Sequence, residues 1–156
     1  MAYTVGEMAR RLGVPASTIR YYDKEGLLPF VGRSSGGIRV FTEKDFEWLR
    51  IIECLKKTGM SLKDIREYIE LAMQGDETIA RRLELFHKQR TVLETRMAEL
   101  QQTMDTLDYK CWFYETAAAR GSTEGISDLP DEALPKALRP VRERLRAAAE
   151  AETEEV

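Results

Sequence analysis

Residues 4–28 read TVGEMARRLGVPASTIRYYDKEGLL, and this stretch decides the fold of the first part of the chain. Thr4 and Glu7 have the spacing of a capping box, in which each residue satisfies a free amide of the other, so a helix is predicted over 5–12. The glycine and proline that follow end this helix and open a second one, predicted over 15–25, because proline suits a first helical turn. Two short helices joined by a tight turn with glycine are typical of a helix-turn-helix.

The next residues predict a small β-hairpin followed by two more helices. A glycine-rich centre at 34–37 separates two extended arms, the second of which alternates apolar and polar residues. Threonine and serine caps, each followed by a later glycine stop, predict helices over 42–58 and 61–74. The last helix carries one apolar stripe: Leu62, Ile65, Ile69 and Ala72. Residues 1–75 are therefore expected to form one small unit.

From Asp76 the apolar residues follow a strict heptad pattern. Spacings of four and three alternate through a seam whose only charged member is Arg90. The seam consists of Ile79, Leu83, Phe86, Arg90, Leu93, Met97, Leu100, Met104, Leu107, Cys111 and Tyr114. The pattern predicts one helix over 76–119, about 65 Å long at about 1.5 Å per residue. Nothing else in the chain is large enough to cover this stripe, so we expect a homodimer; a long helix in a monomeric bundle is the alternative.

The last segment, 120–156, contains prolines at 130, 135 and 140 and ends in an acidic, alanine-rich tail. This composition predicts a loop, at most one short helix after Pro140, and a frayed acidic end. A segment of this size is not expected to enclose a ligand pocket by itself.

Composition excludes several classes of protein. No window approaches the roughly 18 consecutive apolar residues of a membrane span, and the start has no targeting pattern, so a cytoplasmic protein without membrane contact is expected. The two cysteines and single histidine fit no zinc spacing, so we expect neither a metal nor another cofactor. The net charge of −3 is uneven: residues 1–41 carry six basic and three acidic side chains, whereas 76–156 carry 12 and 17. The acidic total therefore does not exclude DNA as a partner.

The predicted second helix carries groups that recognise DNA. Hydroxyl, guanidinium and aromatic side chains that reach base edges and phosphates are interleaved on it: Ser17, Thr18, Arg20, Tyr21 and Tyr22. Arg33 and Arg39 lie on the predicted hairpin, where a wing would contact the flanking DNA backbone. In the alternative interpretation, the two tyrosines are ordinary half-buried helix residues and Arg20 is a surface charge.

These segments, together with GRSSGGIRVFTEKDFEWLRIIECLKKTGMSLKDI at 32–65, resemble the DNA-binding domain of the MerR family of bacterial transcription regulators. The resemblance implies a mainly α protein with a winged helix-turn-helix domain (1–75), an antiparallel coiled-coil dimerisation helix (76–119) and a short extension (120–156). It also implies a dimer that binds a promoter inverted repeat and distorts the spacer for RNA polymerase. By the same resemblance, the DNA contacts are the five residues of the second helix, Arg33 and Arg39 in the wing, and Lys56 on a phosphate. Ile38 and Phe41 stand where the family often has tyrosine, so hydroxyl contacts from those positions are not carried over.

Cys54 is the candidate effector site. Arg50 and Lys57 lie one helical turn before and after it, and nearby cations favour the nucleophilic thiolate. The stretch around Cys54 also resembles the aldehyde- and nitrosative-stress branch of the family, which implies that Cys54 senses a small electrophile. The alternative is a small buried hydrophobe. Cys111 belongs to the seam, but in an antiparallel dimer it is a candidate to resolve an oxidised Cys54.

Three other functions are the alternatives to this interpretation. The first is a regulator of the same type with a non-covalent effector. This sequence lacks the metal-site cysteines that metal-sensing members of the family carry, so the effector would be a small molecule. A coiled-coil adaptor that binds protein would show no DNA preference and little salt dependence. A thiol enzyme is disfavoured, because the only histidine, His87, lies on the predicted dimer helix, so we expect no enzymatic activity.

Overall fold

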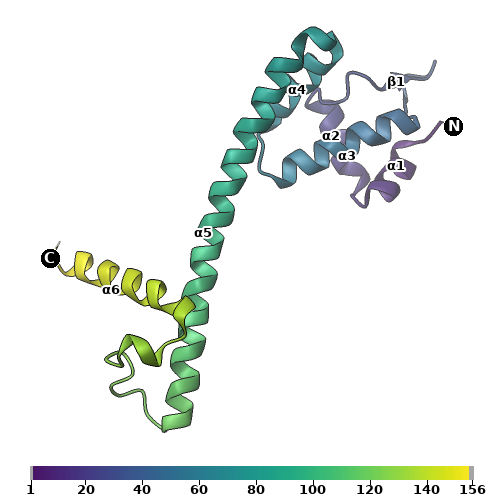
Figure 1. Cartoon of the computed structure of the whole chain (residues 1–156). Helices are drawn as coiled ribbons and strands as arrows, with labels where there is room; N and C mark the ends of the chain where they lie inside the picture. The colour runs from purple at the N-terminus through teal and green to yellow at the C-terminus, as the bar shows by residue number, and fades with distance from the viewer. Residues whose placement is uncertain (1, 155–156) are drawn as a thin grey trace. The chain divides into compact units, whose positions relative to one another are not determined.

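The structure, a computed structural model, describes residues 2–154, so Met1 and the last two residues of the predicted acidic tail lie outside it. The chain divides into two compact units, Met1–Leu93 and Glu94–Val156. Each unit consists mainly of helices, as the sequence predicts (Figure 1).

The helix-turn-helix is formed by α1 (Val5–Leu12) and α2 (Ala16–Lys24). The predicted capping box is present: the Glu7 amide donates to Thr4 Oγ1 at 3.2 Å, and the Thr4 amide donates to Glu7 Oε2 at 2.7 Å. Gly13 ends α1 with a φ of +73°, a left-handed conformation that glycine adopts without steric cost. α2 begins one residue later than predicted, because Pro15 is its N-cap.

The predicted hairpin is the two-stranded wing of the first unit. β1 (Gly32–Arg33) and β2 (Arg39–Val40) pair in antiparallel fashion, with Gly32 opposite Val40. The helices α3 (Glu43–Lys57) and α4 (Leu62–Gln74) follow, and the side chains of Thr42 and Ser61 cap them. The order of elements in this unit is therefore that of a winged helix-turn-helix.

A single hydrophobic core joins these elements. Its fully buried side chains come from all four helices and from the end of the wing, and each stabilises the fold by about 1.5–3 kcal/mol. They include Met8, Ile19, Tyr22, Phe41, Leu49, Ile52, Ile65 and Ile69. The stripe predicted on α4 faces this core, since Ile65 and Ile69 are fully buried and Leu62 packs against them.

The long helix is present as α5 (Ile79–Arg120), preceded by the 3-10 turn η1 (Asp76–Thr78). Its first turns belong to the first unit: Phe86 packs edge-on against Tyr68 with ring centroids 5.0 Å apart, and Gln89 Nε2 donates to the Thr58 carbonyl at 2.9 Å. The division between the units therefore falls inside α5, whereas the sequence placed its boundaries at the ends of the long helix.

The seam predicted on α5 is exposed in the single chain. Eight of its apolar side chains retain between 38% and 70% of their surface: Ile79, Leu83, Phe86, Met97, Leu100, Met104, Leu107 and Tyr114. Apart from Phe86, which packs against Tyr68, and the half-buried Leu93, no described part of the chain covers this stripe, as the heptad pattern predicts. Among the described residues, no helix is long and apolar enough to cross a membrane.

The second unit contains more helix than the sequence predicts. After the short turns η2 (Asp131–Ala133) and η3 (Lys136–Leu138), α6 (Arg139–Glu154) runs for 16 residues rather than as one short helix after Pro140. Alanine, arginine and glutamate dominate this helix and have high helix propensity. The first turns of α6 pack on α5: Val141 is buried with Tyr109 and Leu134, and Trp112, Leu138 and Leu145 are partly buried around them. Beyond these turns α6 leads away from α5 (Figure 1).

Candidate nucleic-acid interface

One face of α2 is polar and exposed. Ser17, Arg20 and Tyr21 point outward, with 45% of Tyr21 exposed, while Ile19 on the opposite side is buried. Thr18 is half-buried at the edge of this face. The exposed side chains recur at three- and four-residue spacing, so they form one surface on a helix that fits a major groove.

Tyr22 does not belong to this exposed face. Its side chain is fully buried, its hydroxyl donates a hydrogen bond to Glu53 on α3, and Lys56 Nζ donates to the same hydroxyl at 2.9 Å. Lys56 Nζ also lies 4.8 Å from the centre of the Tyr22 ring. Burial, followed by the hydrogen bond to Glu53, raises the pKa of Tyr22 well above its ordinary value. Tyr22 and Lys56, both expected at the DNA, thus join α2 to α3.

The two wing arginines converge on a carboxylate of α2. Arg39 forms an ion pair with Asp23, and Arg33 Nη2 lies 3.3 Å from the same carboxylate while its Nη1 donates to the Gly37 carbonyl at 2.9 Å. The hydrogen bonds from Arg39 are the main reason that the pKa of Asp23 is lowered. The Arg39 side chain is 19% exposed and that of Arg33 is 52% exposed. Arg39 therefore holds the wing against α2, and Arg33 has the more accessible guanidinium.

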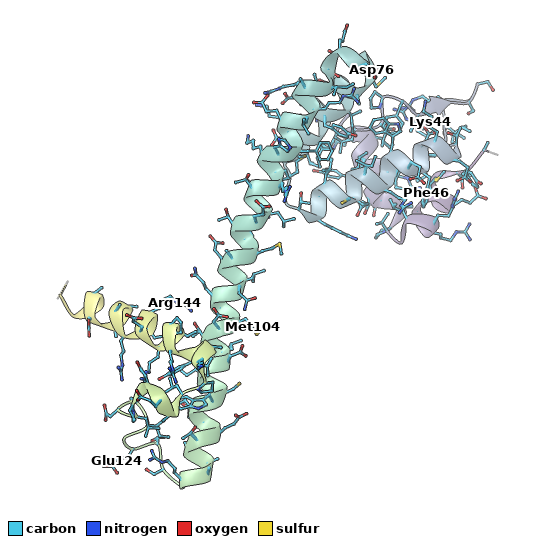
Figure 2. The ribbon with its side chains drawn as sticks, in the orientation of Figure 1. Lys44, Phe46, Asp76, Met104, Glu124 and Arg144 are labelled. Atoms are coloured by element: carbon cyan, nitrogen blue, oxygen red, sulfur yellow. The ribbon has the colours of Figure 1, made fainter. Side chains whose placement is uncertain are left out.

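A second set of polar contacts holds the base of the wing. Arg11 on α1 makes a bidentate contact with Glu43, at 2.8 and 2.9 Å, and Tyr3 donates a hydrogen bond to the same carboxylate. The Arg11 guanidinium also lies 4.3 Å from the ring centre of Phe46, which is labelled in Figure 2. The hydrogen bonds from Arg11 are the main reason that the pKa of Glu43 is lowered to about 2. Tyr3 in turn pairs with Phe41 through backbone hydrogen bonds of 2.8 and 2.9 Å, next to β2.

Sequence reasoning missed the acidic residues that organise this surface. Asp23 and Glu53 lie within the motifs that predict DNA binding, but their roles depend on partners that are distant in sequence. Their sequence signal is that each lies among several cations. A cation that is held in one position commonly forms a charge-assisted hydrogen bond with a carboxylate. Arg20, in contrast, makes no ion pair with any described residue.

Cys54 is exposed on α3, and Cys111 is exposed on α5. The interpretation of Cys54 as a buried hydrophobe is therefore wrong for the single chain. Of its two neighbouring cations, Arg50 lies 3.5 Å from the Glu47 carboxylate, and Lys57 is exposed. Among the described residues, no group of three or more His, Cys, Asp or Glu side chains is arranged to hold a metal ion.

The fold is a winged helix-turn-helix with an exposed polar face on α2 and a basic wing that Asp23 holds through ion pairs. These features define the class of winged helix-turn-helix DNA-binding proteins. The model of the MerR HTH family regulatory protein matches residues 3–72, and the model described as "MerR, DNA binding" matches residues 46–109. The chain belongs to the MerR family of DNA-binding transcriptional regulators.

Individual relatives agree with this assignment. One is HiNmlR, whose crystal structure is described as a MerR family regulator lacking the sensor domain, bound to promoter DNA. Its sequence is 48% identical to this chain, and the match covers 83% of this chain and 98% of the HiNmlR chain with a TM-score of 0.71. An uncharacterised HTH-type regulator of Haemophilus influenzae is 48% identical over 127 residues, which is 81% of this chain and 94% of the relative. The regulator AdhR of Bacillus subtilis is 35% identical over 86 residues, or 55% of this chain and 61% of AdhR.

Proposed function

We propose that the chain works as a homodimer that binds an inverted repeat in a promoter, distorts the spacer for RNA polymerase, and responds to a reactive electrophile such as an aldehyde at Cys54. Each protomer places the exposed face of α2 in a major groove, where Ser17, Arg20 and Tyr21 contact base edges and phosphates, with Thr18 at the margin. Arg33 contacts the flanking backbone. The DNA-bound relative supports this arrangement.

Tyr22, Arg39 and Lys56 act on DNA mainly through the groups they hold. Tyr22 is buried and Arg39 is ion-paired to Asp23, so they set the positions of α2 and the wing. Lys56 is half-buried against Tyr22. Its ammonium reaches a phosphate only if it keeps part of its hydrogen-bonding capacity, and with three donors it can serve both partners.

The exposed seam of α5 supports the dimer. A stripe of leucine, methionine and aromatic side chains at heptad spacing is stable in water only when a second helix covers it. We propose an antiparallel coiled coil, in which the late turns of one α5 approach the first unit of the other protomer. Cys111 lies on this seam and is therefore placed near the interface.

The observation that carries the sensing proposal is the position of Cys54. Its thiol is exposed, and the residue before it, Glu53, accepts the hydrogen bond of the buried Tyr22 on the recognition helix. A chemical change at Cys54 therefore occurs next to the contact that positions α2.

The proposed chemistry is reversible addition. The Cys54 sulfur forms a bond to the aldehyde carbonyl carbon, the carbonyl π pair moves to oxygen, and that oxygen takes up the proton that the thiol releases, which gives a hemithioacetal. The product is bulkier than the thiol and carries a new hydroxyl group, so it changes packing and hydrogen bonding beside Glu53 and Lys57.

A reporter under the regulator's own promoter tests this proposal. Cys54→Ser is expected to abolish induction by formaldehyde or methylglyoxal, whereas Cys111→Ser keeps it, and gel-shift titrations are expected to show equal promoter affinity for both variants and the parent protein. Induction that survives in Cys54→Ser would exclude the thiol from sensing and favour a non-covalent effector.

A further inference from the structure

The second unit contains a cavity that the proposed function does not use. It has a volume of about 390 Å³ and lies between α5 and α6, within the range of small-molecule sites. Its apolar lining comes from Tyr109 and Phe113 on α5 and from Leu145 on α6. The segment after α5 was not expected to enclose a pocket by itself, but together with α5 it lines one.

The polar lining of this cavity is cationic. Lys110, Arg142 and Arg146 line it, and none of the described lining residues is acidic. Arg142 is largely neutralised, because it forms an ion pair with Asp131 and donates to the Leu129 carbonyl at 2.6 Å. Arg146 donates to the neutral Ser127 carbonyl at 2.6 Å, and Lys110 Nζ lies 5.6 Å from the centre of the Phe113 ring. Neither Arg146 nor Lys110 forms an ion pair with a described residue, and the carboxylates nearest to Arg146, those of Glu143 and Glu150, line a neighbouring hollow and not this cavity.

The cavity lies away from the seam of α5. The seam passes through Leu107, Cys111 and Tyr114, whereas Tyr109 and Phe113 occupy heptad positions on the outer side of the helix, under α6. The apolar lining of the cavity is therefore separate from the seam, while Lys110 lies beside the seam residue Cys111. The match to the DNA-bound HiNmlR chain covers 98% of that chain but 83% of this one, so part of this chain has no counterpart in it.

We infer that this cavity binds a small organic anion, a carboxylate or sulfonate with an aromatic or branched apolar body. Arg146 and Lys110 pair with the anionic group, and Tyr109, Phe113 and Leu145 contact the apolar body. A neighbouring hollow of about 570 Å³ along α6 lacks this preference, because Asp131, Glu143 and Glu150 line it alongside arginines. The inferred site is separate from Cys54 and from the DNA-reading face.

Calorimetric titration of the full-length protein with 2-naphthoate tests the inference, and 2-naphthamide is the uncharged match. We expect one saturable site per chain that binds the carboxylate at least about tenfold more tightly than the amide. Lys110→Ala and Arg146→Ala are each expected to weaken naphthoate binding by about five- to tenfold, because each removes a charged partner. The Trp48→Phe variant keeps Trp112 as its remaining tryptophan. Naphthoate is expected to change the Trp112 fluorescence of this variant over the same concentrations at which calorimetry detects binding.

Two further variants make the test decisive. Ala149→Glu places a carboxylate in the lining and is expected to abolish naphthoate binding while sparing naphthamide. Arg144→Ala removes one positive charge from α6 outside the lining and is expected to leave the affinity for naphthoate unchanged (Figure 2). Arg146→Ala also removes the contact with the Ser127 carbonyl and can loosen that loop. Lys110→Ala changes an exposed side chain on α5 and is expected to fold normally, so it tests the charge by itself. Equal affinity for acid and amide, no saturation below roughly 10 mM, or equal losses in Arg144→Ala and Lys110→Ala would overturn the inference.

Discussion

Replacing Tyr22 by Phe removes one buried hydroxyl and leaves the core shape unchanged. The hydroxyl donates to Glu53 and accepts from Lys56, so the substitution breaks two hydrogen bonds to charged groups between α2 and α3. The contact of the Lys56 ammonium with the aromatic ring is retained, because it depends on the ring and not on the hydroxyl. The change therefore isolates the polar connection beneath the recognition helix.

The expected loss of unfolding free energy is about 1–2 kcal/mol. A hydrogen bond to a charged group contributes about 1.5–3 kcal/mol, but Glu53 and Lys56 are only half-buried and recover part of this loss by turning to water. In a chain of 156 residues each kcal/mol corresponds to about 2–4 °C, so Tm falls by about 2–8 °C.

Urea unfolding at one fixed protein concentration measures this loss, because the stability of a dimer depends on concentration. A double-mutant cycle with Glu53→Gln is expected to give a coupling energy above about 0.5 kcal/mol. A loss below about 0.5 kcal/mol for Tyr22→Phe, together with no coupling, would refute the role assigned to this hydroxyl.

The pH dependence gives the same prediction an independent test. Tyr22 has a raised pKa in the folded state, so its contribution to stability is fully present below the unfolded value of 10.0 and is lost as pH rises through the folded value. The stability difference between the parent protein and Tyr22→Phe is therefore expected to shrink above about pH 10. A constant difference across that range would contradict the raised pKa.

Three other substitutions test the dimer seam, the Asp23 ion pair and the groove contact of Arg20. Leu100→Glu places a charge on the exposed seam and is expected to raise the dimer dissociation constant at least about tenfold in sedimentation velocity, whereas Gln102→Glu, on the outer face of α5, leaves it unchanged. Asp23→Asn is expected to cost about 1 kcal/mol at pH 7. Because the folded pKa of Asp23 is lowered, its contribution is present above 3.8 and is lost as pH falls through the folded value, so urea unfolding near pH 3 is expected to show a smaller difference. Arg20→Ala is expected to weaken binding to the promoter by about 1–3 kcal/mol and to relax discrimination at one base pair, and a titration curve equal to that of Arg144→Ala would remove the groove contact.

Local signals predicted most of the first unit. Helix caps and stops depend on residues that lie within one turn of each other, so they can be predicted from the sequence alone. Here they are the capping box of Thr4 and Glu7, the caps at Thr42 and Ser61, and the glycine that follows each helix. The heptad seam is also a local pattern, and it correctly predicted a helix whose apolar side the single chain leaves exposed.

The partners of the cations were not predictable in the same way. Arg39 finds Asp23 across 16 residues, and Tyr22 finds Glu53 across 31, so both pairs exist only after the core has formed. Composition shows that a surface is basic, but it does not show which cations are already paired. In the tail, the prolines predict a loop, whereas Leu138, Val141 and Leu145 have the three- and four-residue spacing of a helix and form the apolar side of the segment that ends in α6.

The pairing of these cations bears on how the proposed dimer recognises DNA. Of the cations predicted at the DNA, Arg39 and Arg33 are paired with Asp23 and Lys56 is hydrogen-bonded to Tyr22, so Arg20 is the one without an ion pair to a described residue. A protein with few free cations has weak non-specific affinity and a shallow dependence on salt, and it gains specificity from two half-sites that are bound together. Binding of that kind is sensitive to small shifts in either recognition helix. In the proposed mechanism, a modification at Cys54 lies next to the Glu53–Tyr22 contact and changes the response of the promoter without contacting DNA.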